Sequence, residues 1–533
     1  MKKLSLSILV LFSMSRLIAQ PNIQWQKCLG GSKEDDAFSI IQTSDGGYVL
    51  AGLTQSNDGD ITNNHSVIDY SDFWVVKLNV TGSIQWQKCY GGSNADAANS
   101  IQQTTDGGYI VAGSAYSNDS DVTANHGGAD YWVLKLDSAG SIQWQKCLGG
   151  SMAESANSVQ QTLNGSYIIA GYSPSTDGNV TGNHGGYSDF WVVSLDSAGS
   201  ILWQKSYGGS NLEVANSIQQ TNDKGYIVAG YTMSNDFDVT GNHGTEDYWV
   251  LKLDSAGLIQ WQKCYGGSSN DEANSIQQTT DGGYIVAGTT YSNDGDVLGS
   301  HGGTDYWIVK LDSTGLIQWQ KCIGGSNYDG ANSIHQTTDG GYIVAGGTGS
   351  NDSDVTGNHS AIGYDDFWLI KLSSAGSIQW QKCLGGYSSD VSTSVKQTTD
   401  GGYIVTGFAT SNDGDVLGNH SLNGYSDIWV VKLSSTTGIK EISYPLSDIS
   451  ISPNIISYST LISFSIYQKS DIEIRVHDVA GRLVKSIFHS TLEPGHHSLT
   501  WEMNDNTILE NGFYLLSILT EGGTTTKMIE VLK

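Results

Sequence analysis

Residues 96–148 read DAANSIQQTTDGGYIVAGSAYSNDSDVTANHGGADYWVLKLDSAGSIQWQKCL. Four short segments within this stretch, at 98–103, 109–115, 130–136 and 142–148, have strand-like composition. Thr-Asp-Gly-Gly joins the first two segments and Asp-Ser-Ala-Gly-Ser joins the last two, and both sequences are typical of tight turns. The stretch therefore predicts a unit of four antiparallel strands.

The same unit recurs along the chain at intervals of 58 to 61 residues. Its last strand carries Trp-Gln-Lys, with the tryptophan at Trp25, Trp86, Trp144, Trp203, Trp261, Trp319 and Trp380. Its third strand carries a second tryptophan, at Trp74, Trp132, Trp191, Trp249, Trp307, Trp368 and Trp429. Because a four-stranded sheet of this size must bury both faces against neighbouring sheets, seven units predict an all-β, seven-bladed β-propeller.

The two ends of the repeat array predict how the ring closes. The second tryptophan of each unit precedes the next Trp-Gln-Lys by 12 residues, which would place a tryptophan at position 441, where the chain has Glu441. The segment 23–29 instead stands alone before the first complete unit. We therefore expect this N-terminal strand to complete the last blade, which would remove two free sheet edges.

The repeat resembles the bacterial seven-bladed β-propeller repeat family. The matching pattern is Gly-Gly-Ser, an acid, Ala-Asn-Ser-Ile, then Asp-Gly-Gly-Tyr-Ile-Val-Ala-Gly and Asp-Tyr-Trp-Val-Val-Lys-Leu-Asp, over about residues 23 to 435. The resemblance implies the fold and implies no particular chemistry.

Composition narrows the possible partners. The formal net charge is −28 and no basic stripe with interleaved aromatics is visible, which argues against nucleic acid. The six cysteines, Cys28, Cys89, Cys147, Cys264, Cys322 and Cys383, fall one to a repeat. Since equivalent positions in different blades lie too far apart for a disulfide, we expect buried free thiols.

The chain begins with features of export. Residues 1–20 place Lys2 and Lys3 before an apolar run and end in a cleavage-like sequence near Ala19, as a signal peptide does. No later stretch approaches the ~20 apolar residues of a transmembrane helix. We expect a propeller at 21–435, a linker at 436–450 and a second domain at 451–533, in a secreted or outer-surface protein.

Candidate site residues gather in the two long loops of each unit, which should emerge on one face. One loop carries an acid in every unit: Asp35, Asp96, Glu154, Glu213, Asp271, Asp329 and Asp390. These carboxylates could surround the channel mouth and attract a cation such as Ca²⁺, or each could accept backbone N–H groups of its own turn.

The other long loop carries a histidine in every unit and a tyrosine in three. Acids such as Asp58 and Asp60 resemble fragments of calcium loops, although turn formation would equally explain them. Units six, seven and one have longer loops containing Tyr364, Tyr425 and Tyr70, which would be neighbours in a closed ring. They could form an aromatic patch that binds a glycan or a protein, or could pack the inserted residues onto the blades.

The last 83 residues, 451–533, show six or seven strand-like segments, which predicts a small immunoglobulin-like β-sandwich. This module resembles the type A sorting domain of the Bacteroidetes type IX secretion system. The resemblance implies export by that machinery, and the residues that carry it, besides Asp478, are Gly481, Arg482, Gly512, Tyr514, Lys527 and Lys533. An ordinary accessory domain is the alternative.

The sequence thus favours a secreted or surface-displayed propeller that binds an extracellular glycan or protein and is not an enzyme. No nucleophile elbow, zinc motif or phosphate loop is present, and acids repeated by rotation lack the different environments that acid and base roles need. A polysaccharide-acting enzyme would require a non-repeated acid or metal set. A structural surface-layer component is the third possibility.

Overall fold

The computed structural model describes residues 20–65, 70–360, 363–421, 424–435, 446–466, 469–478, 482–493, 495–503, 509–520 and 523–532. Contacts divide the chain between Thr436 and Thr437 into two compact units. The predicted signal peptide 1–20, except Gln20, lies outside the described residues, as do 436–445 of the predicted linker. The remainder of that linker is strand, because β29 begins at Leu446.

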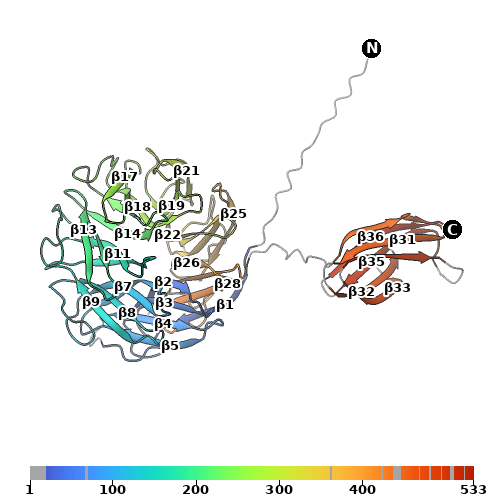
Figure 1. Ribbon diagram of the computed structural model, residues 1–533, viewed down its shortest axis with the longest axis horizontal. Helices are drawn as coiled ribbons and strands as arrows, with labels where there is room; N and C mark the ends of the chain where they lie inside the picture. The colour runs from blue at the N-terminus through green and yellow to red at the C-terminus, as the bar shows by residue number, and fades with distance from the viewer. Residues whose placement is uncertain are drawn as a thin grey trace, which may run out of the picture. The chain divides into compact units, whose positions relative to one another are not determined.

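The first unit is a β-propeller of seven four-stranded antiparallel sheets placed around a common centre (Figure 1). In the first three complete sheets the strands are β2 (Asp35–Gln42), β3 (Tyr48–Thr54), β4 (Asp72–Leu78), β5 (Ile84–Tyr90); β6 (Asp96–Gln103), β7 (Tyr109–Ala115), β8 (Asp130–Leu136), β9 (Ile142–Leu148); and β10 (Ser155–Gln161), β11 (Tyr167–Ser173), β12 (Asp189–Leu195), β13 (Ile201–Tyr207). In the next three they are β14 (Glu213–Gln220), β15 (Tyr226–Thr232), β16 (Asp247–Leu253), β17 (Ile259–Tyr265); β18 (Asp271–Gln278), β19 (Tyr284–Thr290), β20 (Asp305–Leu311), β21 (Ile317–Ile323); and β22 (Asp329–Gln336), β23 (Tyr342–Thr348), β24 (Asp366–Leu372), β25 (Ile378–Leu384).

The remaining sheet is built from both ends of the unit. It contains β26 (Asp390–Gln397), β27 (Tyr403–Ala409), β28 (Asp427–Leu433) and the N-terminal β1 (Ile23–Leu29), in the order β1-β28-β27-β26. β1 pairs antiparallel with β28, so that Cys28 lies opposite Trp429, and Ser434 N–H donates to Asn22 O at 2.8 Å. The strand that stands alone in the sequence therefore belongs to the last sheet.

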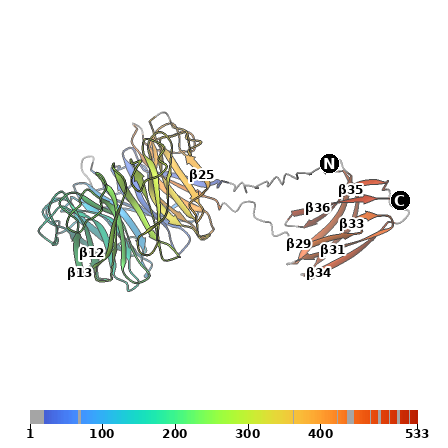
Figure 2. The ribbon, with the colours of Figure 1, turned by 90° about the horizontal axis from the view of Figure 1, so that it is seen from above.

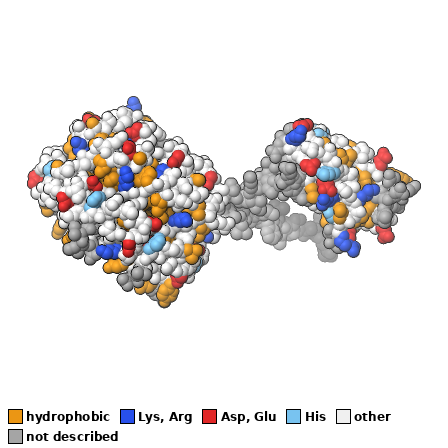
Figure 3. Space-filling view, turned by 90° about the horizontal axis from the view of Figure 1, so that it is seen from below, with side chains coloured by type: hydrophobic (Ala, Val, Ile, Leu, Met, Phe, Trp, Pro, Cys, Tyr) orange, Lys and Arg blue, Asp and Glu red, His pale blue; other side chains and the backbone are white. Residues whose placement is uncertain are grey.

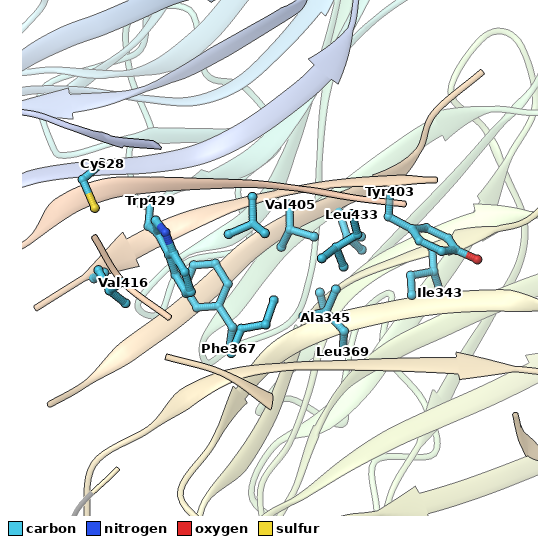
Figure 4. Packing of buried hydrophobic residues seen from close by; sticks show 14 of the residues in the cluster. Cys28, Ile343, Ala345, Phe367, Leu369, Tyr403, Val405, Val416, Trp429 and Leu433 are labelled. Atoms are coloured by element: carbon cyan, nitrogen blue, oxygen red, sulfur yellow. The ribbon is translucent and has the colours of Figure 1, made fainter. Parts of the chain in front are cut away.

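Apolar side chains between neighbouring sheets form the core. The tryptophan of each third strand is fully buried, and its indole N–H donates to a glutamine on the fourth strand, as Trp249 does to Gln262 at 2.9 Å. Figure 4 shows the apolar side chains between two neighbouring sheets. Trp429 of the last sheet packs on Phe367 of the sheet before it, with the ring centroids 4.7 Å apart. All six cysteines are buried free thiols, as predicted, and burial raises the pKa of Cys28 to about 12.

Hydrogen bonds between innermost strands join consecutive sheets at two levels. At the first, a serine hydroxyl oxygen accepts a backbone N–H of the next sheet, as Ser158 accepts from Ile218 at 3.2 Å. Seven such bonds are present, and one of them joins Ser394 of β26 to Ile40 of β2. At the second level, seven glutamine side chains each accept a backbone N–H from the tight turn of the preceding sheet. Gln42, for example, accepts the Thr399 N–H at 2.8 Å. The last sheet is thus bonded to the first in the same way as any other pair.

The second unit contains two sheets around a shared core (Figure 2). Apolar residues of both sheets, such as Phe464 and Ile474, belong to one buried cluster. One sheet holds β29 (Leu446–Ser452), β31 (Ser459–Ile466) and β34 (Gly495–Glu502); the other holds β30 (Ile455–Ile456), β36 (Gly523–Val531), β35 (Gly512–Thr520), β32 (Ser470–Asp478) and β33 (Leu483–Leu492).

The described residues of the predicted sorting signal lie within strands of this second unit or directly beside them. Arg482 donates to the Asp478 carboxylate from its backbone N–H at 2.9 Å and from its guanidinium Nε at 2.7 Å, bridging the β32–β33 turn. Gly512 starts β35 at φ 153°, and Lys527 lies exposed in β36. The Tyr514 hydroxyl donates to Glu510 O at 3.1 Å. Gly481 and Lys533 lie outside the described residues.

Candidate functional site

The repeated acids are internal parts of their turns. Asp35 is fully buried, and its carboxylate accepts the Gly31 N–H at 2.7 Å, the Ser56 hydroxyl at 2.8 Å and the Thr54 hydroxyl. Asp96, Asp271 and Asp329 are equally buried and accept an equivalent glycine N–H and hydroxyl, and the equally buried Asp390 accepts the backbone N–H groups of Gly386 and Ser411. The structure places these carboxylates inside their own turns, as one of the two interpretations expects, and a role in binding a cation or ligand stays a prediction.

Burial has a clear electrostatic consequence for these acids. It raises the pKa of Asp35 to about 7, against the lowering effect of the hydroxyl and N–H donors around it. Burial raises the pKa of Asp96, Asp271, Asp329 and Asp390 to about 6, again against such donors. The pKa of each of these five carboxyls is therefore raised toward neutral pH.

The histidine loops are likewise held by internal bonds. The His243 ring Nδ1 lies 2.7 Å from the buried Asp247 carboxylate, which also accepts the His243 N–H at 2.9 Å. The acids that resemble calcium ligands bond to backbone, as Asp58 accepts from Ser32 N–H at 2.8 Å. Among the described residues, no group of three or more His, Cys, Asp or Glu side chains is placed to hold a metal ion.

Tyr70, Tyr364 and Tyr425 are exposed on their long loops, at 49, 48 and 44% of their surface. Ser360 and Ser421 hydroxyls donate to the carbonyls of Tyr364 and Tyr425, both at 2.7 Å. Within the part of the chain that the structure describes, no ring contact joins the three tyrosines. The rings are available to a ligand, and their joint action as one patch stays a prediction.

A second set of aromatic and acidic residues lies on the same face, at positions that the repeated pattern does not predict. We call it the tyrosine–glutamate cluster, and its members are Tyr172, Tyr231, Tyr291, Tyr328, Glu246 and Glu272. Tyr172 and Tyr231 are the penultimate residues of β11 and β15, and Tyr291 follows β19 directly. These strands end at the long loops, so the side chains lie at the long-loop end of the blades.

The charge of Glu272 acts on several other members of the cluster. After burial, Glu272 is the largest influence that raises the pKa of Tyr231 and of Tyr291. Burial raises the pKa of Tyr328 to about 12, with contributions from Tyr291, Asp365 and Glu272. Tyr231 lies in β15, Glu272 lies in β18 and Tyr328 directly precedes β22, so the cluster spans the seams between three consecutive blades.

Two carboxyls of the cluster form a pair. Burial raises the pKa of Glu246, and the nearby charge of Glu272 and a hydrogen bond with its carboxyl add to the rise. The pair therefore holds a proton at a pH where free glutamates are ionised. Equivalent positions in the other units carry no second glutamate pair; for example, Ser188 stands in place of Glu246 and Val214 in place of Glu272.

The signal for this cluster was present in the sequence as deviation from the repeat. The position of Tyr231 is occupied elsewhere by Leu53, Ser114, Tyr172, Thr289, Gly347 and Phe408, whereas its flanking Gly and Thr, Ser or Ala positions hardly vary. Because the residue at this position changes from blade to blade while its neighbours do not, the propeller fold does not dictate which side chain stands there. The residues that recur in every unit therefore do not predict this cluster.

Figure 3 shows Lys and Arg side chains of the first unit as separate points among neutral residues on the face in view. Among the described residues, no helix has the length and apolar character needed to cross a membrane.

Comparisons with known proteins give distant matches. No family model matches the chain. The regulatory protein FlaEY of Caulobacter vibrioides is 25% identical over 188 residues, which are 33% of this chain and 20% of that protein, so the match spans a fifth of its length.

Solved structures match over more of the chain at lower identity. PorZ, a surface component of the type-IX secretion system of Porphyromonas gingivalis, is 10% identical with a TM-score of 0.39, over 95% of this chain and 60% of that chain. The Pan2 WD40 domain of Neurospora crassa is 10% identical with a TM-score of 0.42, over 76% and 95%.

Proposed function

We propose that this protein is a secreted or surface-displayed binding protein whose closed, seven-bladed propeller takes an extracellular glycan through its long-loop face. The tyrosine–glutamate cluster is the observation that carries the proposal. Aromatic rings stack on the apolar faces of sugars, and carboxylates accept hydrogen bonds from sugar hydroxyls. Both kinds of group are present here, where the charge of Glu272 raises the pKa of Tyr231, Tyr291 and Tyr328, and they stand at positions that vary between blades.

The binding test uses the purified full chain on an array of bacterial and algal glycans, followed by titration calorimetry of each glycan that is retained. We expect Tyr231→Ala and Tyr291→Ala to weaken binding at least ~10-fold, because truncating a central aromatic anchor typically costs more than about 1.4 kcal/mol. Tyr187→Ala, which removes a ring 75% exposed on another long loop, is the matched control and should bind normally.

A separate arm distinguishes the two aromatic surfaces. In one variant Tyr70, Tyr364 and Tyr425 are all replaced by alanine. If this variant loses glycan binding while Tyr231→Ala still binds, the site is the patch on blades six, seven and one. If neither variant changes the affinity of any retained glycan, the long-loop face is not the glycan site, and protein partners become the alternative.

A hydrolytic function is the second candidate, favoured by the Glu246–Glu272 pair. One protonated and one ionised carboxyl can serve as acid and base, and the pair is not repeated around the ring. We still propose a binding protein. Release of reducing ends from a bound glycan, lost in Glu272→Gln without loss of binding, would instead establish the enzyme.

We further propose that the second unit is an immunoglobulin-like sorting domain read by type IX secretion machinery. The support is that the turn between Asp478 and Arg482 and the segment Gly512–Tyr514 resemble the sorting-domain motifs. In that turn Arg482 donates two hydrogen bonds to the Asp478 carboxylate. Expressed in a bacterium that has this machinery, the full chain should reach the surface or medium. A chain ending at residue 450 should remain in the periplasm, as should Arg482→Ala if the bridged turn is the part recognised; equal export of the truncated chain would refute the proposal.

A further inference from the structure

The innermost strands line a cavity of about 350 Å³ on the propeller axis. Its wall is made mainly by serine and glutamine side chains that the repeat supplies at equivalent places. The glutamines Gln102, Gln160, Gln219 and Gln277 accept a backbone N–H from the next sheet at 2.5 or 2.6 Å. The repeated wall of the cavity is therefore polar and uncharged.

Three consecutive sheets depart from this pattern. Ile41, His335 and Lys396 occupy the place of the glutamine in β2, β22 and β26, and all three line the cavity. They belong to the same blades, one, six and seven, whose long loops carry the extra tyrosines. Lys396 and His335 are the titratable side chains of the lining.

Lys396 differs from the other inward-lying lysines of the propeller. Each lysine of a third strand, such as Lys252, forms an ion pair with an aspartate of the neighbouring tight turn, here Asp223 at 2.9 Å. Five more pairs repeat this contact around the ring. No acceptor or carboxylate partner of the Lys396 ammonium is found among the described residues.

The cavity leaves this cation without a counter-ion and surrounds it with hydrogen-bond donors. Burial lowers the pKa of Lys396, and burial together with Lys396 lowers that of His335 to about 3. Ser39 and Ser394, which line the cavity on blades one and seven, each accept a backbone N–H at 3.4 Å, so their hydroxyl protons remain free to donate. The part of the lining that blades six, seven and one supply therefore offers one potential positive charge and several O–H donors, and no carboxylate.

We infer that the axial cavity is a binding site for an oxyanion, a carboxylate or phosphate group of a small solute, with the Lys396 ammonium as its counter-ion. An anion would keep the ammonium protonated and supply the hydrogen-bond acceptor that the Lys396 side chain lacks. Lys396 is the penultimate residue of β26, next to the turn at Thr398, so the site lies toward the tight-turn face. It is thus separate from the proposed glycan site at the long-loop end.

Lys396→Gln is a well-matched variant because glutamine is the residue that four other sheets carry at this position. The full chain would be titrated calorimetrically with sodium acetate and with inorganic phosphate near pH 6, at an ionic strength fixed with sodium chloride. Binding of at least one probe is expected, and Lys396→Gln should weaken it at least ~10-fold, the usual scale for a lost charge-assisted hydrogen bond. Acetate and phosphate distinguish the two sources of the oxyanion.

The control is Lys321→Gln, which removes a lysine that lines a separate pocket on an outer strand, and it should leave the affinity unchanged. In parallel, the Lys396 Cε carbon signal of ¹³C-lysine-labelled protein should move toward the protonated form when the probe binds. Equal affinity in the wild type and Lys396→Gln, or no saturable binding of either probe, would overturn the inference. Glycan binding through Tyr231 should persist in Lys396→Gln, so the two proposals fail independently.

Discussion

Deletion of residues 20–29 should abolish the folded, monomeric propeller. β1 supplies the outer strand of the last sheet, and Leu29 and Cys28 of β1 are almost fully buried. The deletion also removes the Trp429 indole donation to Gln26 at 2.8 Å and the contact of Trp25 with Tyr48, at 5.7 Å between centroids. Each fully buried apolar side chain contributes about 1.5–3 kcal/mol, so several such losses approach the whole stability of a typical domain.

The deletion also leaves β28 as an open sheet edge, and every side chain of β28 is buried in the intact protein. An apolar open edge pairs with other chains, so we expect aggregates in size-exclusion chromatography and no cooperative melt of the first unit in calorimetry. A deletion of residues 1–19 is the control and should melt like the full chain.

A transplant makes the prediction specific to strand pairing. The turn Asp-Ser-Ala-Gly-Ser joins third and fourth strands in blade two, and Asn22 lies beside Ser434. Inserting that turn and residues 23–29 after Leu433 of the deleted chain should restore the monomer and its melt. A deleted chain that stays monomeric and folded without the transplant would show that β1 is dispensable.

Strand positions followed closely from the sequence because repetition sampled each strand seven times. The segments expected at 109–115, 130–136 and 142–148 are β7, β8 and β9 with the same bounds. The innermost strand was expected from 98 and begins at Asp96, because a bulge at Asn99 shifts the register and lets pairing continue beyond it.

The sequence predicted the candidate site much less well than the strands, and repetition is again the reason. A repeated acid such as Asp271 satisfies the same turn in each blade, so its recurrence reports the fold. Tyr231, Glu272 and Lys396 stand where the repeat varies, and their meaning depends on which blades are neighbours in space and which seams they face. The arrangement of the seven blades in space supplies this information, and the sequence of a single unit does not contain it.

The stability of the propeller should increase as the pH falls from 8 to 5. The pKa of Asp35 is raised to about 7 and that of Asp96, Asp271, Asp329 and Asp390 to about 6, in each case mainly by burial. A group with a raised pKa in the folded state binds its proton more tightly there than in the unfolded chain. Its contribution is therefore complete below the unfolded pKa near 3.8 and is lost as the pH rises through 6 to 7.

The opposite set of carboxyls limits this gain at low pH. Asp45 and Asp106 each pair with a buried third-strand lysine, and hydroxyl, lysine and N–H donors lower their pKa to about 2 in spite of partial burial. Their contribution exists above 3.8 and is lost as the pH falls toward 2. The two sets together predict a stability maximum near pH 4 to 5.

Calorimetric melts of the full chain from pH 3 to pH 8 check the profile. One pKa unit corresponds to about 1.4 kcal/mol, so five such carboxyls predict a rise in Tm of at least ~5 °C between pH 8 and pH 5. Asp271→Asn removes one titrating group without removing its volume and should make the rise smaller. Asp312→Asn, in an exposed tight turn, is the control and should leave the slope between pH 8 and 5 unchanged. A Tm that is flat or falls over this range would mean that the turn carboxyls are ionised in the folded protein, and that the hydroxyl and N–H donors around them outweigh burial.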